Sequence, residues 1–365
     1  MAIEKDELIL DVRNLDISFK TSNGVVQAVR GVNIDLYKGE TIAIVGESGS
    51  GKSVTVKAIM GILASNGQIN SGEIVYTYEK DEKKLEVDLI KLGKKQIRKQ
   101  INGKQIAMIF QDPMTSLDPT MTVGKQIMEG MRYHYRTKKD QAYQKAVKLL
   151  ELVGITNPKQ RMKNYPHELS GGMRQRVVIA IALACDPDVL ICDEPTTALD
   201  VTIQAKILEL IADIQKKTGI SVIYITHDLG VVAKVADYVS VMYAGRIVER
   251  GTVNEVFYDP KHPYTWGLLA AMPDLETETG ELQPIPGNPP NMARELIGDP
   301  FLTRNRYALK IDERIEPPLF RISRHHYAAS WLMDPRAPEV KMPAELANRI
   351  ARMKKEGELY VQDQK

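Results

Sequence analysis

A run of eight residues contains three spaced glycines, and the last of them is followed directly by a lysine and a serine. The run consists of Gly46, Glu47, Ser48, Gly49, Ser50, Gly51, Lys52 and Ser53. It follows a short apolar segment typical of a buried strand and leads into a segment with helical character, which is the context of a phosphate-binding loop. The glycines let backbone N–H groups curl around phosphate oxygens, and the start of the helix adds a positive dipole. Lys52 is expected to reach the β- and γ-phosphates of a nucleotide, and the Ser53 hydroxyl to ligate Mg²⁺.

Polar side chains also end two further apolar runs. Asp193 and Glu194 end the run in "DVLICDE", and His227 ends the run in "SVIYITHD". Asp193 can hold Mg²⁺ directly or through water, and Glu194 can orient or deprotonate water for in-line attack. His227 is expected to hydrogen-bond the γ-phosphate and to hold Glu194 and the water in place. Taken alone, two acids can be surface residues and a histidine is more often structural, but their positions at strand ends after the loop favour catalysis.

Gln111, in "MIFQDP", is expected to touch the metal or the attacking water. Because it also leads into a helical region, it would sense whether the γ-phosphate is present. A glutamine by itself indicates little, so this interpretation depends on the loop and the acids.

A second glycine pair occurs in "ELSGGMRQR", from Glu168 to Arg176. It stands beside the hydroxyl of Ser170 and beside two arginines. Since the first loop already suits a nucleotide, the residue types alone leave the role of this second pair open.

The hydrophobic pattern predicts the elements that position these groups. Residues 8–19 and 32–40 alternate apolar and polar side chains, which predicts antiparallel strands. The runs that precede the loop, the acids and the histidine predict strands buried on both faces. Residues 200–219 place apolar side chains on one helical face and stop at Gly219. Strand, helix and strand in this order predict a parallel sheet with helical crossovers and polar groups at its carboxyl edge.

Three other segments differ in composition. Residues 79–104 are rich in Lys and Glu and are interpreted as a solvated insert between strands. Residues from about 125 to 180 are interpreted mainly as helices, one of which stops at Gly154. Beyond about residue 255 the Pro- and Gly-rich stretch "QPIPGNPPNM" indicates a boundary before a small C-terminal domain.

The composition of the whole chain excludes several classes of protein. Its 365 residues, 43% hydrophobic and 26% charged, suffice for one large domain and a smaller one. The net charge of +2 does not indicate a protein coated in nucleic acid. Cys185 and Cys192 suit neither a disulfide framework nor a zinc site and favour a reducing cytoplasm. No segment has the length of a membrane helix, so any membrane would be reached through a partner.

The motifs taken together resemble those of the ATP-binding cassette (ABC) ATPases. The loop, "QDP", "LSGG", "LICDEP", "TALD" and "ITHD" follow one another in the order and spacing of that family, between Phe19 and His227. The resemblance implies an α/β P-loop fold with a parallel sheet, an antiparallel β subdomain and a helical subdomain inserted at about 113–178. It also implies that Phe19 stacks on adenine, although a strand aromatic in the core is the alternative.

The resemblance gives the second glycine pair a role. In this family two cassettes join head to tail, and the signature of each contacts the γ-phosphate of the ATP bound by the other. The matching residues here are Ser170, Gly171, Gly172 and Met173. Asp200 of "TALD" is implied to lie at the same dimer seam.

The fifth signature residue is Met173, whereas the family usually has Gln. Through this departure, together with "IFQDPMTSLDP" and the C-terminal "HPYT", the chain resembles the D-type ATPase subunit of bacterial oligopeptide and dipeptide permeases. The resemblance implies an ATP-binding domain at 1–255 and a permease-type domain at 256–365. It further implies pairing with an F-type ATPase beneath two membrane permease subunits, an extracellular peptide-binding protein, and a peripheral position on the cytoplasmic face of the plasma membrane.

Many relatives carry four cysteines in the C-terminal domain, suited to an iron–sulfur cluster. This chain has Asp299, Asn305, Asp312 and Ser330 at those places. Without thiolates no such cluster is expected. The carboxylates could bind another metal, but a region held by hydrogen bonds and packing is the favoured prediction.

Two other functions are compatible with parts of the pattern. An importer of nickel or another small solute would use the same type of ATPase, because the ATPase does not touch the solute. A cassette protein that acts as an ATP switch on nucleic acid or the ribosome is disfavoured, because those proteins usually carry two cassettes or a long coiled-coil insert.

Overall fold

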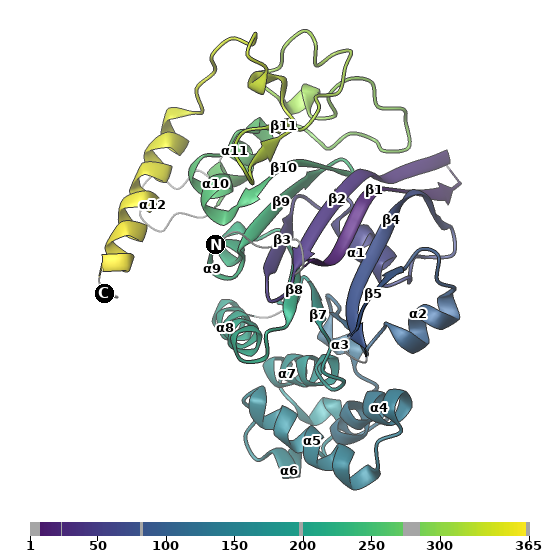
Figure 1. The fold of residues 1–365 in the computed structure, drawn as a ribbon. Coiled ribbons are helices and arrows are strands. Elements are labelled where there is room, and N and C mark those ends of the chain that lie inside the picture. Colours follow the sequence, from purple (N-terminus) through teal and green to yellow (C-terminus); the bar gives the residue numbers. More distant parts are fainter. Residues whose placement is uncertain (1–7, 23, 81–82, 197–199, 273–284, 363–365) are drawn as a thin grey trace.

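The computed structural model describes residues 8–22, 24–80, 83–196, 200–272 and 285–362. Two β-sheets form the centre of the molecule, a group of helices lies below them, and the last part of the chain crosses the top and descends along one side (Figure 1). Within the described ranges, none of the helices combines the length and the apolar character that a membrane span needs.

The strands of the larger sheet are β3 (Thr41–Val45), β6 (Ile106–Ile109), β7 (Val189–Asp193), β8 (Ser221–Thr226), β9 (Tyr238–Tyr243), β10 (Arg246–Thr252), β11 (Phe320–Arg321) and β12 (Tyr327–Ala328). They are ordered β11-β12-β10-β9-β3-β8-β7-β6. From β9 to β6 neighbouring strands are parallel, which confirms the predicted parallel sheet. From β9 to β11 they are antiparallel.

The central strand β3 is buried on both faces, which explains its continuous apolar sequence. Successive side chains of a strand point to opposite faces of the sheet. Ile42 and Ile44 therefore enter one hydrophobic core, and Ala43 and Val45 enter the other. The strand is thus fixed between two packed layers, and the loop that follows it starts from a rigid position.

The smaller sheet consists of β2 (Gly24–Tyr37), β1 (Leu8–Thr21), β4 (Gly67–Lys80) and β5 (Lys83–Asp88), in that order and antiparallel throughout. The antiparallel strands expected within residues 8–19 and 32–40 are confirmed. The helix α1 (Lys52–Ile59) shares a hydrophobic core with this sheet, to which it contributes Val56 and Ile59.

Residues 79–104 are more than the solvated insert that their composition suggested. They contain the end of β4, all of β5 and the helix α2 (Lys94–Gln100). Their Lys and Glu side chains on β5 are exposed, but Leu89, Ile97 and Ile101 are buried in the core beneath the smaller sheet. A few apolar residues among many charged ones therefore attach this segment to the fold.

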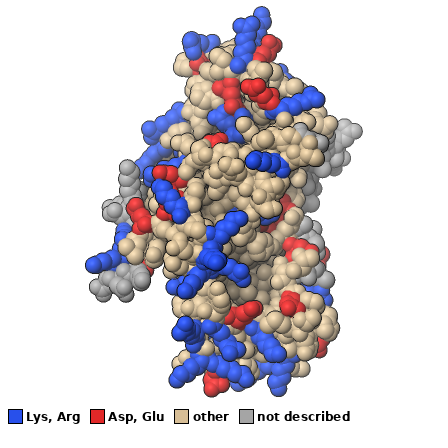
Figure 2. All heavy atoms as spheres, turned by 90° about the vertical axis from the view of Figure 1, so that its right-hand side faces the viewer, with Lys and Arg blue, Asp and Glu red and all other residues tan. Residues whose placement is uncertain are grey.

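The helical part and the helices that cover the larger sheet comprise α3 (Pro113–Ser116), α4 (Val123–Tyr135), α5 (Lys139–Leu152), α6 (Pro158–Arg161), η2 (Pro166–Glu168), α7 (Gly171–Ala182), α8 (Val201–Thr218) and α9 (Leu229–Val235). The expected helices between about 125 and 180 are present, and α8 stops before Gly219 as its pattern predicted. Figure 2 shows one face of the molecule, on which Lys and Arg side chains are frequent over the lower, helical part.

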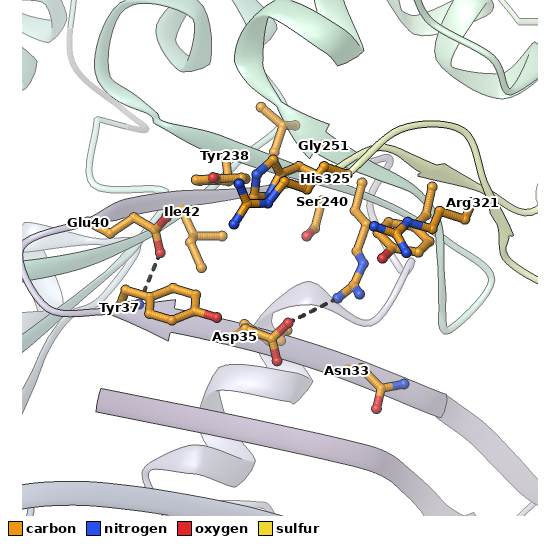
Figure 3. Close-up of a pocket in the computed structure, with 15 residues that line it drawn as sticks. Asn33, Asp35, Tyr37, Glu40, Ile42, Tyr238, Ser240, Gly251, Arg321 and His325 are labelled. Carbon is orange, nitrogen blue, oxygen red and sulfur yellow. Dashed lines mark hydrogen bonds and ion pairs between the residues drawn. The ribbon is translucent and has the colours of Figure 1, made fainter. Parts of the chain in front are cut away.

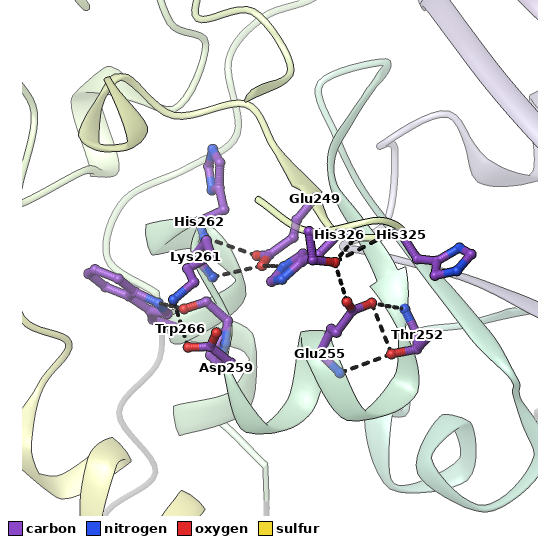
Figure 4. A network of polar contacts seen from close by, with 11 residues as sticks. Glu249, Thr252, Glu255, Asp259, Lys261, His262, Trp266, His325 and His326 are labelled. Carbon is purple, nitrogen blue, oxygen red and sulfur yellow. Dashed lines mark hydrogen bonds and ion pairs between the residues drawn. The ribbon is translucent and has the colours of Figure 1, made fainter. Parts of the chain in front are cut away.

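The remaining elements are α10 (Val253–Tyr258), α11 (Pro263–Ala270), η3 (Leu302–Arg304), η4 (Trp331–Met333) and α12 (Ala344–Gln362). The fully buried Glu249 of β10 attaches this part of the chain to the sheet (Figure 4). Its carboxylate accepts hydrogen bonds from the backbone N–H of Lys261 at 2.7 Å and of His262 at 3.0 Å. It also contacts Nε2 of His326 at 2.7 Å. One buried carboxylate thus joins β10 to the turn before α11 and to the approach to β12.

A cavity of about 340 Å³ lies between β2, the β9–β10 hairpin and the segment around β11 and β12 (Figure 3). Its lining is of mixed charge and includes Glu40, Arg250 and Arg321. Glu40 is buried, and only one of its carboxylate oxygens has a hydrogen-bond partner, the backbone N–H of Tyr37 at 3.0 Å. Burial raises the pKa of Glu40 to about 7.

This shifted pKa predicts a pH-dependent stability. The folded state favours the neutral form of the Glu40 carboxyl. The contribution of this group to the free energy of unfolding is therefore fully present below the unfolded pKa near 4.5, and it is lost as the pH rises through about 7. Glu40→Gln should therefore stabilise the chain at pH 8 by about 2 kcal/mol and change little at pH 5. Urea unfolding at both pH values measures the difference. Glu86→Gln on exposed β5 is the matched control, and an equal effect of Glu40→Gln at both pH values would contradict the prediction.

Candidate nucleotide-binding and catalytic site

The glycine-rich loop connects the end of β3 to the start of α1, and two of its glycines are required by their surroundings. Gly46 has φ 149°, and a Cβ there would lie 2.1 Å from the carbonyl oxygen of Met242. Gly51 has φ 104° and precedes the first residue of α1. A Cβ on Gly51 would lie 2.5 Å from the carbonyl oxygen of Ala28. The loop therefore rests directly on backbone from β9 and β2, which leaves no room for a side chain.

Lys52 is buried, and its ammonium group lies inside the loop. Nζ donates hydrogen bonds to the carbonyl oxygens of Gly46 at 2.7 Å and Glu47 at 2.9 Å. Burial lowers the pKa of Lys52, while the carboxylates of Glu194, Asp193 and Glu47 act in the opposite direction. A phosphate group placed against this ammonium would accept charge-assisted hydrogen bonds from it.

The Ser53 hydroxyl donates a 2.8 Å hydrogen bond to Oδ1 of Asp193 at the end of β7. Asp193 is buried, and burial raises its pKa, while the hydrogen bond from Ser53 and the charge of Lys57 act to lower it. The structure therefore joins two predicted metal ligands that are far apart in the sequence. A hydroxyl and a carboxylate are hard oxygen ligands of the kind that Mg²⁺ prefers, and a cation would offset the cost of the buried charge. These residues fit that ion.

Glu194 is the centre of a second cluster. Nε2 of Gln111 donates a 2.7 Å hydrogen bond to Oε2 of Glu194, and Nδ1 of His227 lies 3.2 Å from Oε1. The three residues follow three different strands, β6, β7 and β8, whose carboxyl ends meet at one edge of the sheet. The predicted catalytic groups are thus brought together, and the Glu194 carboxylate lies between an amide and an imidazole that can orient it.

The backbone of Glu194 is strained. Its φ of 47° lies in the left-handed region, which costs a non-glycine residue about 1–2 kcal/mol. The N–H of Glu194 donates to the carbonyl oxygen of Ile225 in β8 at 2.9 Å, which holds the strained residue in place. Strain of this kind is tolerated where the direction of the side chain matters more than local stability.

Phe19 lies on β1, opposite Val26 of β2 and Gly67 of β4. Its half-buried ring covers Gly67, where a Cβ would lie 2.7 Å from Cε1 of the ring. The ring therefore contributes to the core beneath the smaller sheet, while part of it remains accessible.

The signature residues lie at the start of α7. Ser170 caps the helix, and its hydroxyl accepts a hydrogen bond from the Met173 N–H at 3.4 Å. Ser170 and Gly171 are exposed, and the first turn of a helix presents unpaired N–H groups that suit an anion. Asp200 caps α8 in the same way, with Oδ1 accepting from the Ile203 N–H at 2.9 Å.

Sequence reasoning missed Gln175, which connects α7 to the segment that follows β7. Its side chain is fully buried, and Nε2 donates a 2.6 Å hydrogen bond to the carbonyl oxygen of Pro195, one residue beyond Glu194. It also missed Arg304, whose guanidinium contacts Glu47 of the loop. No local pattern could have found Arg304, because the contact spans 257 residues of sequence.

Four C-terminal residues stand at the positions where the resembled family often has cysteines. Each of their side chains stabilises a local turn. Oδ1 of Asp299 accepts from the Phe301 N–H, Oδ1 of Asn305 from the Tyr307 N–H, Oδ2 of Asp312 from the Leu309 N–H, and Oγ of Ser330 from the Leu332 N–H. Burial raises the pKa of Asp299 to about 6 and also raises the pKa of Asp312. In the described part of the chain, no three His, Cys, Asp or Glu side chains form a metal-binding group.

Comparison with known proteins finds two family models along the chain. The model described as ABC transporter matches residues 29–197, and the model described as oligopeptide/dipeptide transporter, C-terminal region, matches residues 248–311. The oligopeptide transport ATP-binding protein OppD of Bacillus subtilis is 58% identical over 347 residues, covering 94% of each chain. The dipeptide transport ATP-binding protein DppD of Lactococcus lactis is 51% identical, covering 97% of this chain and 98% of that protein.

Among solved structures, the fold is similar to a dimeric bacterial ABC transporter cassette, with a TM-score of 0.57 and 25% identity. The match covers 67% of this chain and 98% of that chain. A second dimeric structure with the same scores is described as a post-hydrolysis state bound to ADP and phosphate.

Proposed function

The chain belongs to the ABC transporter family of oligopeptide and dipeptide transport ATP-binding proteins, and we propose how its residues bind and hydrolyse ATP to drive peptide import. Its function is that of the ATP-hydrolysing subunit of an ABC importer. The observation that carries the proposed site is the convergence of Gln111, Glu194 and His227 beside the Ser53–Asp193 pair.

The loop and its surroundings hold the triphosphate. Lys52 exchanges its hydrogen bonds to the loop carbonyls for bonds to the β- and γ-phosphates, and backbone N–H groups at the start of α1 bind the remaining oxygens. Phe19 lies against adenine. Ser53, Asp193 and Gln111 would hold Mg²⁺, and the bound ion would neutralise charge on the phosphate oxygens.

Glu194 orients and deprotonates the attacking water. The amide of Gln111 and the imidazole of His227 contact the two carboxylate oxygens and orient the carboxylate for this role. His227 is mostly exposed and can follow the phosphate as the charge develops. Electrostatic stabilisation by Lys52 and the loop N–H groups supplies most of the rate enhancement.

The second half of each ATP site comes from another ATPase subunit. Ser170, Gly171, Gly172 and Met173 cover the ATP of an F-type partner, and Asp200 lies at the seam between the two chains. The exposure of Ser170 and Gly171 at a helix N-terminus supports this proposal, because these groups have room for an anion from outside the chain. The domains are 1–255 for ATP binding and 256–365 for the C-terminal part.

The pair of ATPases lies beneath two membrane permease subunits, on the cytoplasmic face of the plasma membrane, and an extracellular protein delivers the peptide. Phe110, next to Gln111, is 43% exposed and offers an apolar contact through which a permease can sense the γ-phosphate. The Lys and Arg side chains over the helical part suit a surface near anionic lipid (Figure 2).

Uptake by the complete transporter tests the substrate class. The chain is co-expressed with its partner ATPase, the permease subunits and the binding protein, and uptake of labelled oligopeptides and of nickel is measured in the same vesicles. We expect ATP-dependent uptake of peptides. Uptake of nickel without peptides would contradict the peptide assignment while leaving the ATPase site intact.

A further inference from the structure

The C-terminal part of the chain makes direct contact with the phosphate-binding loop through Glu47. Arg304, at the end of η3, donates from Nη1 to Oε2 of Glu47 at 2.6 Å and from Nη2 to Oε1 at 2.9 Å. This two-pronged geometry is the strongest form of an arginine–carboxylate pair. The Arg304 side chain is 2% exposed and the Glu47 side chain 31% exposed, so the pair lies mostly out of solvent.

Arg304 is itself held in place on several sides. Its Nε donates to the carbonyl oxygen of Pro286 at 2.8 Å, and Nη2 also lies 3.4 Å from the carbonyl oxygen of Ile285. Nη1 lies 3.4 Å from the Tyr243 hydroxyl. The hydrogen bonds to Glu47 raise the pKa of Arg304, so the guanidinium is charged at every physiological pH. The cation therefore has a fixed position as well as a fixed charge.

The main chain of Glu47 is held by the same region. Its N–H donates to the Tyr264 hydroxyl at 2.9 Å. The Tyr264 ring packs in an aromatic cluster with Tyr243 at 4.6 Å and Phe301 at 5.4 Å between ring centroids. Both the backbone and the side chain of this loop residue are thus bound by groups that lie outside the phosphate-binding motif.

A second group of ion pairs joins the C-terminal part to β2 and β10, next to the backbone on which the loop rests. Glu316 contacts Arg30 at 2.7 Å and Arg246 at 2.9 Å. The neighbouring Gly245 N–H donates to the carbonyl oxygen of Ser50 in the loop at 3.0 Å. The loop is therefore anchored at its second and fifth residues.

The charge on Glu47 makes the contact with Arg304 relevant to ATP. A carboxylate within a loop that receives a triphosphate repels the ligand unless a cation compensates it. Lys52 cannot be the only compensation, because its ammonium is needed by the phosphates and already contacts the Glu47 carbonyl oxygen. Arg304 neutralises the carboxylate and turns it toward the C-terminal part.

We infer that Arg304 is a positioning residue for ATP binding, through which the C-terminal part of the chain sets the affinity of the phosphate-binding loop for ATP. It acts through Glu47 and does not touch the nucleotide. The inference rests on the proposed binding of ATP by this loop.

Two substitutions test this role in the complete transporter: one removes the positive charge of Arg304, and the other removes the negative charge of Glu47. Photolabelling of this chain with azido-ATP gives its half-saturating concentration, and the ATPase rate at saturating ATP gives kcat. Arg304→Gln should raise the half-saturating concentration about 10-fold and change kcat less than about threefold, because one unpaired negative charge is added near the phosphates. Glu47→Gln should lower the half-saturating concentration.

The double variant distinguishes charge from simple structural damage. Adding Glu47→Gln to Arg304→Gln removes the unpaired carboxylate and should restore the half-saturating concentration to within about threefold of the wild-type value. Damage to the fold would instead be increased by the second substitution. Arg336→Gln is the matched control, because it breaks an exposed ion pair with Asp334 in the same region and should leave ATP binding unchanged.

Three results would overturn the inference: an unchanged half-saturating concentration in Arg304→Gln, no recovery in the double variant, or an equal loss in Arg336→Gln. If Arg304→Gln does not fold, two other variants replace it. Arg304→Lys keeps the charge, and Tyr264→Phe removes the acceptor for the N–H of Glu47. Arg304→Lys should then bind ATP better than Tyr264→Phe, and the reverse order would overturn the inference. Absence of labelling and hydrolysis in the wild-type complex would refute the proposed function itself, which separates the two failures.

Discussion

Glu194→Gln should lower the ATPase rate at this chain's site about 10³-fold while ATP still binds, because the substitution removes the proposed general base and keeps its shape. The amide can still contact Gln111 and His227, so the surrounding cluster is retained. Glutamine also has the same backbone preferences as glutamate, and the strain at φ 47° is therefore unaltered. The rate is measured in the complete complex, with the proposed partner ATPase inactivated so that only this site contributes.

The matched control is Glu209→Gln on the exposed face of α8, which makes the same chemical change far from the phosphate-binding loop in sequence. Peptide uptake by the Glu194→Gln complex should fall together with hydrolysis, since resetting the transporter requires ATP to be consumed. A rate within tenfold of the wild-type value would show that another group activates the water.

Lys52→Ala should weaken ATP binding to this chain at least about 100-fold. Charged hydrogen bonds are worth about 1.5–3 kcal/mol each, and the ammonium is expected to contact two phosphates. The substitution also leaves the carbonyl oxygens of Gly46 and Glu47 without the donor that holds the loop together. The half-saturating concentration of azido-ATP measures this effect directly.

Lys94→Ala on α2 is the control for loss of one positive charge, because Lys94 is exposed. The two catalytic-site variants also differ in kind. Glu194→Gln should bind ATP and fail to hydrolyse it, whereas Lys52→Ala should fail to bind it. If Lys52→Ala bound ATP normally, the loop would hold phosphate through its backbone alone.

The sequence predicted much of the fold because the elements concerned have strong local patterns. Continuous apolar runs identified β3, β7 and β8, and helical periodicity with a terminal glycine identified α8. The order of these elements then implied a parallel sheet, since right-handed crossovers allow few other topologies. Residues 79–104 were interpreted less well, because three buried side chains among many charged ones leave no visible period.

Local pattern was weakest where the chain returns to itself over long distances. β12 pairs with β10 and extends the main sheet, although the composition indicated a change of domain near residue 255. Glu249 collects hydrogen bonds from two later segments, and nothing in the sequence of β10 distinguishes it from an ordinary strand glutamate. Such contacts depend on packing that no short window of sequence contains.

By itself, the sequence determined the chemical groups of this protein: a loop whose glycines and lysine suit phosphate, and acids and a histidine at the ends of apolar runs. Their types and spacing suffice because strand ends of a parallel sheet must share an edge. Only the tertiary structure decided which groups support them, including the strained backbone of Glu194, the bond from Gln175 to Pro195, and the Arg304 guanidinium on Glu47. The physical reason is that a hydrogen bond between distant segments is specified by three-dimensional position, for which neither partner carries a local signal.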